Sequence, residues 1–362
     1  MSDAAWILGA AGRVGRAVAA RLHEAGLPLV LAGRDRDRLA RLADELGGAP
    51  RLVTGPLSEL LPQLTRDAPA VVINTVGPFT ATAAEVARAC PPGTHYVDVT
   101  NERPAAQDIL DLDQAAADTG RVLVTGAGFG VLATESVLLH VCEGRTGEPA
   151  ARVRVDALAS VASEPGVVGY ALAASILGGL GDGGQEVRHG RLAPARLAGH
   201  PERLTTPDGE IVTTASIPTA ELLAAWRGSQ AESVVAASSL VPTGPVTRLF
   251  PAVSALFRVP GVTAFATGRL ARVRMKARPR PRPSSWAHAR VEWPSGTVRE
   301  GWLRAGDGMD FTVAATAEVA LRLARGEGRP GAYTPGALFG PDLAVAAGGE
   351  FGAQTERTAS IR

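Results

Sequence analysis

The sequence predicts an α/β protein with a Rossmann-type, doubly wound parallel sheet at the N-terminus and a second α+β domain built on a mixed sheet. Two observations carry this prediction. From Trp6 to Thr125, short apolar runs alternate with helical segments, as in doubly wound folds. From Arg152 onward the pattern changes to alternating polar and apolar residues with tight turns between the runs.

The first half divides into predicted strands with helices between them. The strands are expected at 6–8, 28–32, 51–54, 70–74, 95–99 and 121–125. The helices are expected at 16–25, 35–46, 57–64 and 104–117, and one more helix follows the turn 75–79 and ends at 89. The run 70–74 is apolar throughout, which is typical of a parallel strand that is buried on both faces.

The segment 6–15 predicts a dinucleotide site. Gly9, Gly12 and Gly15 are three residues apart and separate an apolar run from a run of helix formers. Glycine permits a sharp turn and the close approach of a ligand. The N–H groups and the positive dipole end of the following helix suit a pyrophosphate. A plain strand-to-helix turn is the alternative. The predicted contacts are Gly9, Ala10, Ala11, Gly12, Arg13, Val14 and Gly15.

The residues after the second strand predict which dinucleotide binds. NAD sites place an acid there for the ribose hydroxyl, whereas this chain has Gly33 followed by Arg34. A guanidinium can pair with a 2′-phosphate and stack on adenine, so we expect NADP(H) with Arg34 as the main determinant. Arg38, one turn along, is a weaker second candidate. In the alternative interpretation Asp35 is the ribose acid, although it stands where a helix N-cap is expected.

The turn after the fourth strand is expected at the nicotinamide end of the cofactor. Ligands of open α/β sheets lie beyond the carboxyl ends of the strands. The predicted residues there are Asn74, Thr75, Val76 and Gly77.

The domain organisation follows from these patterns. We expect a dinucleotide-binding domain at 1–130, an α+β substrate or dimerisation domain at 131–312, a C-terminal segment at 313–348 that returns to the nucleotide domain, and a loose tail at 349–362. Hairpins are predicted around 189–190, 207–209 and 294–296. Trp286, Trp293 and Trp302 are expected to pack the second sheet against its helices.

Composition excludes several classes of function. A net charge of +1 gives no support for nucleic acid as a partner. Cys90 and Cys142 are far apart, so neither a disulfide framework nor a metal knuckle is expected. The six histidines show no HExxH or HxH pattern, and no GxSxG or GxxxxGK[ST] motif occurs. The missing cysteine and histidine patterns predict a protein without a metal. No leader precedes Trp6, so we expect a cytoplasmic protein.

Two segments raise the question of a membrane. The segment 165–181 carries no charge but is too short to span a bilayer, so a buried helix is expected. The segment 269–282 holds seven basic residues and follows an amphipathic stretch at 246–270. A solvated loop is expected there, and attachment to anionic lipid through 246–282 is the alternative.

Several motifs carry a family resemblance. GAAGRVG, AGRDRDRL, NTVGPF, HYVDVTNE and TGAGFG occur in an order and spacing that resemble the saccharopine dehydrogenase-like oxidoreductases, in particular the branch that includes trans-acting enoyl reductases. The similarity continues through GGLGDGGQEVRHGRLAP to YTPGALFGPDLA, so it covers nearly the whole chain. It implies NADP(H)-linked reduction but fixes no substrate. The spacing of Gly9, Gly12 and Gly15 departs from the GxGxxG of saccharopine-forming enzymes, which puts that activity in doubt.

Reduction of a C=C or C=N bond also needs a proton donor, because the cofactor supplies the hydride. The Tyr-x-x-x-Lys pair of short-chain dehydrogenases is absent, since Lys276 is the only lysine. Tyr96 and Asp98, on one side of the fifth strand, are candidates, with a core tyrosine and a capping aspartate as the alternative. Tyr170 is the third candidate, against a packing role.

Together these observations predict an NADP(H)-dependent reductase of a small, partly apolar metabolite, with a homodimer as a further expectation. The rivals are a catalytically silent cofactor-binding sensor or scaffold and a lipid-surface protein. The lipid-surface interpretation requires that the segment 246–282 is not buried within the second domain.

Overall fold

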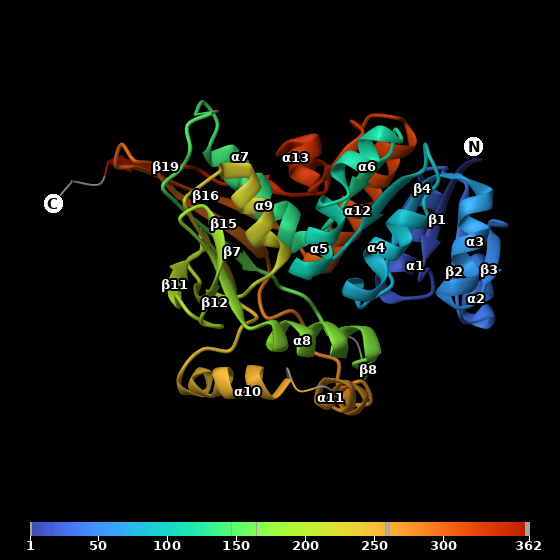
Figure 1. Cartoon of the computed structure of the whole chain (residues 1–362), viewed down its shortest axis with the longest axis horizontal. Helices are drawn as coiled ribbons and strands as arrows, with labels where there is room; N and C mark the ends of the chain where they lie inside the picture. Colours follow the sequence, from blue (N-terminus) through green and yellow to red (C-terminus); the bar gives the residue numbers. More distant parts are fainter. Residues whose placement is uncertain (1, 146, 164, 258, 260, 359–362) are drawn as a thin grey trace.

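The computed structural model describes residues 2–145, 147–163, 165–257, 259 and 261–358. These residues form a seven-stranded sheet, a larger mixed sheet and a small two-stranded ribbon. Figure 1 shows the first sheet with its helices on one side of the molecule and the mixed sheet on the other, with helix α8 (Tyr170–Asp182) below and between them.

The first sheet is parallel throughout and has the strand order β17-β6-β5-β4-β1-β2-β3, which confirms the doubly wound prediction. The strands are β1 (Ser2–Leu8), β2 (Leu29–Gly33), β3 (Arg51–Thr54), β4 (Pro69–Asn74), β5 (His95–Asp98), β6 (Val122–Val124) and β17 (Gly331–Tyr333). The last of these comes from the C-terminal part of the chain and pairs with β6.

Helices cover both faces of this sheet because successive strand residues point to opposite sides. Ile7 and Ile73 belong to a core cluster with residues of α1 (Arg13–Glu24), α2 (Arg36–Leu46) and α12 (Gly308–Ala324). Trp6 and Val72 belong to a second cluster with residues of α3 (Leu57–Asp67), α4 (Phe79–Ala89) and α5 (Arg103–Leu110). The continuous apolar runs of the sequence therefore reflect burial on both faces.

The predicted helix at 104–117 is wrong in one respect, because it is broken into α5 and α6 (Asp113–Asp118). Asp113 accepts a hydrogen bond from the backbone N–H of Ala332 in β17 at 2.7 Å. This contact ties the start of α6 to the edge strand and accounts for the interruption.

The second sheet is mixed and has the main strand order β10-β9-β13-β7-β15-β16-β18, with β11, β12 and β19 attached to it. Its strands are β7 (Arg152–Leu158), β9 (Gly184–Arg188), β10 (Arg191–Ala195), β11 (Glu202–Thr205), β12 (Ile211–Ser216), β13 (Ser233–Ser238), β15 (Ser285–Glu292), β16 (Thr297–Ala305), β18 (Glu350–Phe351) and β19 (Thr355–Thr358). The three predicted hairpins are β9–β10, β11–β12 and β15–β16. Helices α7 (Thr134–Val141) and α9 (Ala220–Ser229) pack on this sheet.

Two expectations about the second domain are wrong. The alternation of polar and apolar residues from Arg152 predicts a half-solvated strand, but every residue of β7 after Arg152 is buried. Trp286 and Trp302 pack edge to face at 6.1 Å in a cluster with Leu204 and Val212 of the β11–β12 hairpin, not against helices. This hairpin covers the outer face of β7, which explains both observations.

The expected loose tail is also corrected. Strands β18 and β19 both pair antiparallel with β16, and only residues 359–362 of the tail lie outside the described residues. The edge of β16 offers unpaired backbone groups, which the tail satisfies by adding strands.

Helix α8 differs most from expectation, because a buried helix was predicted and only Ala173 and Leu177 of α8 are buried. Its neighbours are α10 (Phe250–Phe257) and α11 (Val262–Leu270), with the ribbon β8 (Gly166–Val167) and β14 (Arg274–Met275) at one end. These short helices cover only one side of α8. Leu172 and Ile176 are exposed, and so is Tyr170 at the first residue of the helix.

A glycine substitution tests the packing at the start of α1. A Cβ on Gly15 would collide with the carbonyl oxygen of Gly9 and lie 2.9 Å from the Cα of Ala10, both backbone atoms. We expect Gly15→Ala to lower the free energy of unfolding by about 1–3 kcal/mol in urea denaturation, because backbone must shift. In Gly178→Ala, where a Cβ meets nothing within 4 Å, the change should be favourable and about 1 kcal/mol or less. Equal stability of the two variants would contradict the packing argument.

Candidate functional site

The predicted dinucleotide turn lies between β1 and α1. Gly9 has a φ of +77°, which favours glycine, and a Cβ there would lie 2.8 Å from Oγ1 of Thr75 in the turn after β4. A Cβ on Gly12 would lie 3.1 Å from the carbonyl oxygen of Gly9. Each glycine of the GxxGxxG motif is therefore required by close approach of backbone, either within the turn or to the neighbouring turn.

The turn also fits the charge of a dinucleotide pyrophosphate. Gly12 is the N-cap of α1 and has no side chain to bond the first helical N–H groups. Within the described part of the chain, the N–H groups of Val14 and Gly15 have no backbone acceptor. Unpaired N–H groups at a helix N-terminus bind phosphate oxygens, so this end of α1 can hold the pyrophosphate.

The residues after β2 distinguish the two interpretations of cofactor choice. Asp35 is the N-cap of α2, because its Oδ1 accepts the backbone N–H of Arg38 at 3.0 Å. Arg38 in turn donates from Nη2 to the carbonyl oxygen of Ala11 at 2.9 Å, so its guanidinium lies at the glycine turn. Arg34 is exposed. This arrangement gives Asp35 a structural task and places a cation beside the turn, which favours a 2′-phosphate.

The turn after β4 holds the predicted nicotinamide-side residues, and two of them have structural bonds. Asn74 is fully buried, and its Oδ1 accepts the backbone N–H of Val76 at 3.0 Å. The Thr75 hydroxyl donates to the carbonyl oxygen of Leu8 at 2.8 Å. Asn74 and Thr75 therefore shape the turn, whereas Val76 and Gly77 are the members that remain available to line a site.

Tyr96 and Asp98 form a closed cluster inside the first domain, which supports the alternative of a core tyrosine and a structural aspartate. Both are fully buried, and the Tyr96 hydroxyl donates to Oδ2 of Asp98 at 2.8 Å. Asp98 also accepts the N–H groups of Thr100 and Gly126 and the hydroxyl of Thr125. Burial raises the pKa of Asp98 to about 6, against the opposing effect of these hydrogen bonds. A proton-donor role for this pair is not supported, because no oxygen of the pair reaches solvent.

The two domains meet at the carboxyl end of the first sheet. A Cβ on Gly77 would lie 3.2 Å from the Cβ of Ala171, so the first turn of α8 lies against the turn after β4. Arg13 donates to the carbonyl oxygen of Ala162 at 3.0 Å. Tyr170, the first residue of α8, is 62% exposed. It is the one predicted proton donor that lies at this junction with an accessible side chain.

Two carboxylates at the junction were not among the predicted site residues. Glu102 accepts the N–H of Thr80 at 2.8 Å and the hydroxyl of Ser175 in α8, so it joins the two domains. Glu221 packs against the backbone of Gly130, and burial raises its pKa. The acidic end of the HYVDVTNE motif was the available signal for Glu102. Glu221 stands in an otherwise ordinary helix start and gave none.

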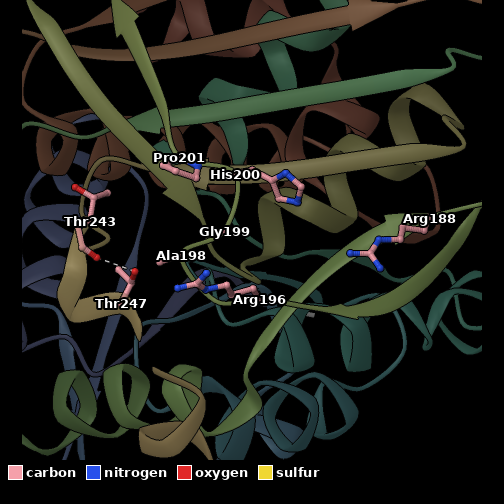
Figure 2. A pocket seen from close by; sticks show the side chains of 9 residues that line it. Arg188, Arg196, Ala198, Gly199, His200, Pro201, Thr243 and Thr247 are labelled. Atoms are coloured by element: carbon pink, nitrogen blue, oxygen red, sulfur yellow. Dashed lines mark hydrogen bonds between the residues drawn. The ribbon is translucent and has the colours of Figure 1, made fainter. Parts of the chain in front are cut away.

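A cavity of about 420 Å³ lies in the second domain (Figure 2). Arg188, Arg196 and His200 line it together with Thr243 and Thr247. Arg188 and His200 both pair with the buried Glu186. None of the predicted site residues contributes to this lining, so the cavity is separate from the predicted cofactor site.

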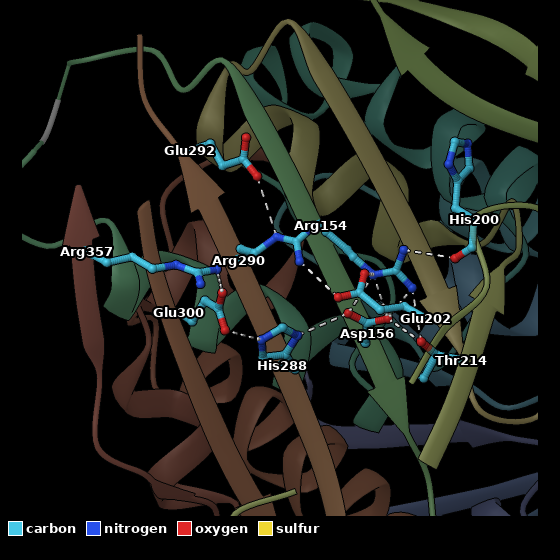
Figure 3. A network of polar contacts seen from close by, with 10 residues as sticks. All are labelled: Arg154, Asp156, His200, Glu202, Thr214, His288, Arg290, Glu292, Glu300 and Arg357. Atoms are coloured by element: carbon cyan, nitrogen blue, oxygen red, sulfur yellow. Dashed lines mark hydrogen bonds and ion pairs between the residues drawn. The ribbon is translucent and has the colours of Figure 1, made fainter. Parts of the chain in front are cut away.

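A polar network crosses the second sheet (Figure 3). Asp156 is fully buried and accepts hydrogen bonds from the guanidinium of Arg154, from the Thr214 hydroxyl at 2.7 Å, and from Nδ1 of His288 at 3.1 Å. Nε2 of His288 lies 3.8 Å from Glu300. His288 and Asp156 are register partners of adjacent strands, a pairing that the sequence does not reveal without the strand alignment.

Comparison with known protein families matches the N-terminal part of the chain. Residues 5–124 match the family described as "Saccharopine dehydrogenase NADP binding domain". This range contains the glycine turn, Arg34 and the turn after β4. No curated protein sequence matches the chain.

Comparison with solved structures finds similar folds. Apo saccharopine dehydrogenase (L-Glu forming) from Saccharomyces cerevisiae matches with a TM-score of 0.63 at 12% identity, over 98% of this chain and 99% of that one. A probable dehydrogenase from Thermotoga maritima matches with a TM-score of 0.44 at 12% identity, over 95% of this chain and 94% of that one. The first match shows that both domains share the fold of the yeast enzyme.

The network of Figure 3 predicts a pH-dependent stability. Burial alone would lower the pKa of His288, but Asp156 and Glu300 raise it above the usual 6.5. The pKa of Asp156 is lowered from 3.8 despite its burial, by His288 and Arg154. The contribution of His288 is therefore complete below pH 6.5 and lost as pH rises through its raised pKa. That of Asp156 is complete above pH 3.8 and lost as pH falls through its lowered pKa.

Denaturation of two variants across the pH range measures this contribution. Asp156→Ala should lower the free energy of unfolding by about 3–5 kcal/mol near pH 6, because it removes a fully buried carboxylate that pairs with both Arg154 and His288 and leaves Arg154 paired with Glu202 alone. His288→Gln should remove the decline in stability above neutral pH. Glu356→Ala, which breaks an exposed pair with Arg299, should cost less than about 1 kcal/mol. A wild-type protein whose stability is flat from pH 5 to pH 9 would refute the role of His288.

Proposed function

We propose that this chain is a saccharopine dehydrogenase-like, NADP-dependent oxidoreductase that reduces a C=C or C=N bond of a small, partly apolar metabolite. NADPH, when bound, supplies the hydride. The observation that carries the proposal is the glycine turn, with its unpaired N–H groups and the neighbouring Arg34 and Arg38. It lies within the range that matches the NADP-binding family.

The chain's own groups have distinct tasks in this proposal. The N–H groups of Val14 and Gly15 hold the pyrophosphate at the start of α1. Arg34 pairs with the 2′-phosphate, while Arg38 is fixed at the turn by its bond to Ala11. Val76 and Gly77 border the nicotinamide, opposite the first turn of α8. The domain junction would then exclude water from the reacting atoms, which favours hydride transfer over side reactions.

Tyr170 is the proposed proton donor. Its exposed hydroxyl belongs to the residue next to Ala171, which contacts Gly77, so it is near the proposed nicotinamide position. Tyr96 and Asp98 act in this proposal only through the fold, because they fix the turns that follow β5 and β6.

A catalytically silent sensor or scaffold is the second candidate. It is favoured by the closed Tyr96–Asp98 cluster, which removes two of the three predicted proton donors from the site. A cytoplasmic location, a homodimer and the absence of a nucleic-acid partner remain predictions from the sequence.

The first test concerns cofactor choice. Arg34→Ala should weaken NADPH binding by about 10- to 100-fold in a titration followed by calorimetry, because a charge-assisted pair to the 2′-phosphate is lost. NADH binding should change by about twofold or less. The control is Arg36→Ala, another exposed arginine, two residues further along at the start of α2. It should leave both affinities unchanged, and equal weakening of NADPH and NADH by Arg34→Ala would remove the specificity argument.

The second test concerns turnover. NADPH consumption is measured with a panel of enoyl and imine substrates, and the reductase proposal expects oxidation with at least one of them. Tyr170→Phe should then lower kcat about 100-fold or more with little change in KM, since general acid catalysis typically contributes this much. A protein that binds NADPH tightly but stays inactive on the whole panel would favour the sensor. Unchanged kcat in Tyr170→Phe would exclude Tyr170 as the donor.

A further inference from the structure

The exposed apolar side chains of this protein are concentrated in one unit of the second domain. Among the described residues, Val167, Tyr170, Leu172, Ile176, Leu240, Leu249, Leu256, Val259, Phe265 and Val273 are large apolar residues with exposed side chains, and only Ile211 and Val345 of this kind lie elsewhere. Most of the ten belong to α8, α10, α11 and the ribbon β8–β14. We call these elements together the helical unit. Such a concentration is typical of an interaction surface and not of a free solvent face.

The segment 248–282, which contains α10, α11 and β14, carries charge of a single sign, and Asp182 at the end of α8 is the one acidic residue in the sequence of the helical unit. Between Glu232 and Glu292 the sequence contains no acidic residue, whereas nine arginines and lysines lie within 248–282. Arg269, Arg272, Arg274 and Lys276 are exposed. Arg269 lies over the ring of Phe265 with 5.4 Å between its guanidinium carbon and the ring centroid, so cation and apolar group occupy the same surface.

The geometry of the unit suits a position on a membrane surface. No single helix in the described part of the chain is long and apolar enough to cross a bilayer; 247–257 and 262–270 pass that test only together, at a bend of 115°. Helices of this length measure about 14–17 Å, roughly half the hydrocarbon thickness of a bilayer. Arg282 anchors the basic segment to the sheet through the carbonyl oxygen of Ala159 at 2.7 Å.

We propose that the helical unit docks on the surface of a lipid bilayer that contains anionic lipids. Exposed apolar side chains enter the interface while arginines and lysines at the same surface pair with lipid phosphates. A second copy of this chain fits less well, because a symmetric contact would bring together two strongly basic surfaces, with only Asp182 of each unit as an acidic residue. The alternative assigned to 246–282 from the sequence is therefore the one that the exposure of this segment favours.

Docking also suggests the source of the substrate, a step that rests on the proposed function. The first turn of α8 contacts Gly77 through Ala171, so the helical unit borders the proposed nicotinamide end of the cofactor site. A bilayer on which this unit docks would bring the apolar molecules dissolved in it to the reacting atoms. The substrate class is thus an apolar metabolite that partitions into the membrane.

Flotation of the full-length protein with vesicles tests the docking and needs no turnover. We expect binding to phosphatidylcholine vesicles that contain phosphatidylglycerol, little binding to phosphatidylcholine alone, and loss of binding at high salt. Phe265→Ser should weaken binding about tenfold or more, and the triple variant Arg272→Gln, Arg274→Gln, Lys276→Gln about a hundredfold.

Matched controls separate a docking surface from general stickiness. Ile211→Ser removes an exposed apolar side chain elsewhere, and Arg41→Gln, Arg88→Gln, Arg203→Gln removes three exposed arginines outside the unit. Both should bind vesicles as the wild type does. Equal loss in both triple variants, or equal binding to neutral and anionic vesicles, overturns the proposal. Unchanged vesicle binding with conversion of a dimer to a monomer in Phe265→Ser would instead assign the surface to a second copy.

Substrate delivery is tested separately by NADPH oxidation with an enoyl lipid in anionic vesicles. The basic triple variant should raise KM and leave kcat unchanged, because the reacting residues are intact. If the wild type is inactive but still floats with anionic vesicles, the result contradicts the proposed function and supports the docking surface. If the wild type reduces the lipid equally well in neutral vesicles, the result contradicts the proposal that docking delivers the substrate.

Discussion

The structure depends on the close approach of three pieces of backbone at the N-terminus of α1. The turn at Gly9, the first turn of the helix at Gly15 and the turn that begins with Thr75 lie so close together that a Cβ on either glycine would meet atoms at or within 3 Å. This approach packs the helix tightly onto the sheet and leaves the first helical N–H groups without side-chain caps. The same constraint therefore stabilises the first domain and, in the proposed function, leaves room for phosphate, because a bulkier turn would close the proposed site and misplace the helix.

Polar residues near this site divide into those that build the turns and those that remain available. Asn74, Thr75 and Asp98 look like site residues in the sequence because they follow strands at the carboxyl edge of the sheet. The structure uses their side chains to bond backbone N–H groups, a hydroxyl or a carbonyl at the strand ends. Buried polar groups must be paired, and the sharp turns that bring a ligand close to the sheet leave many backbone groups to satisfy. The accessible chemistry is therefore left to few groups, among them Arg34 and Tyr170.

The sequence predicted the first domain well because its signals are local. Apolar runs, turn glycines and the Asp35 N-cap each fix structure within a few residues, and the strand β3 matches its predicted bounds. The errors concern contacts between distant segments. Burial of β7 depends on the β11–β12 hairpin, and the pairing of Asp156 with His288 depends on strand register. The exposure of α8 depends on how few helices pack against it, which an apolar sequence alone cannot reveal.

Helix α8 is exposed because few elements pack against it. A helix with this apolar content would ordinarily be covered on most sides, yet α8 has α10 and α11 on one side and the turn after β4 at its first residues. In the proposed function, the domain junction beside Gly77 must admit an apolar substrate. Under that proposal the protein's own side chains cannot seal the junction permanently. An external apolar phase that covers α8 reversibly resolves this conflict, since it supplies burial for Leu172 and Ile176 without blocking the junction.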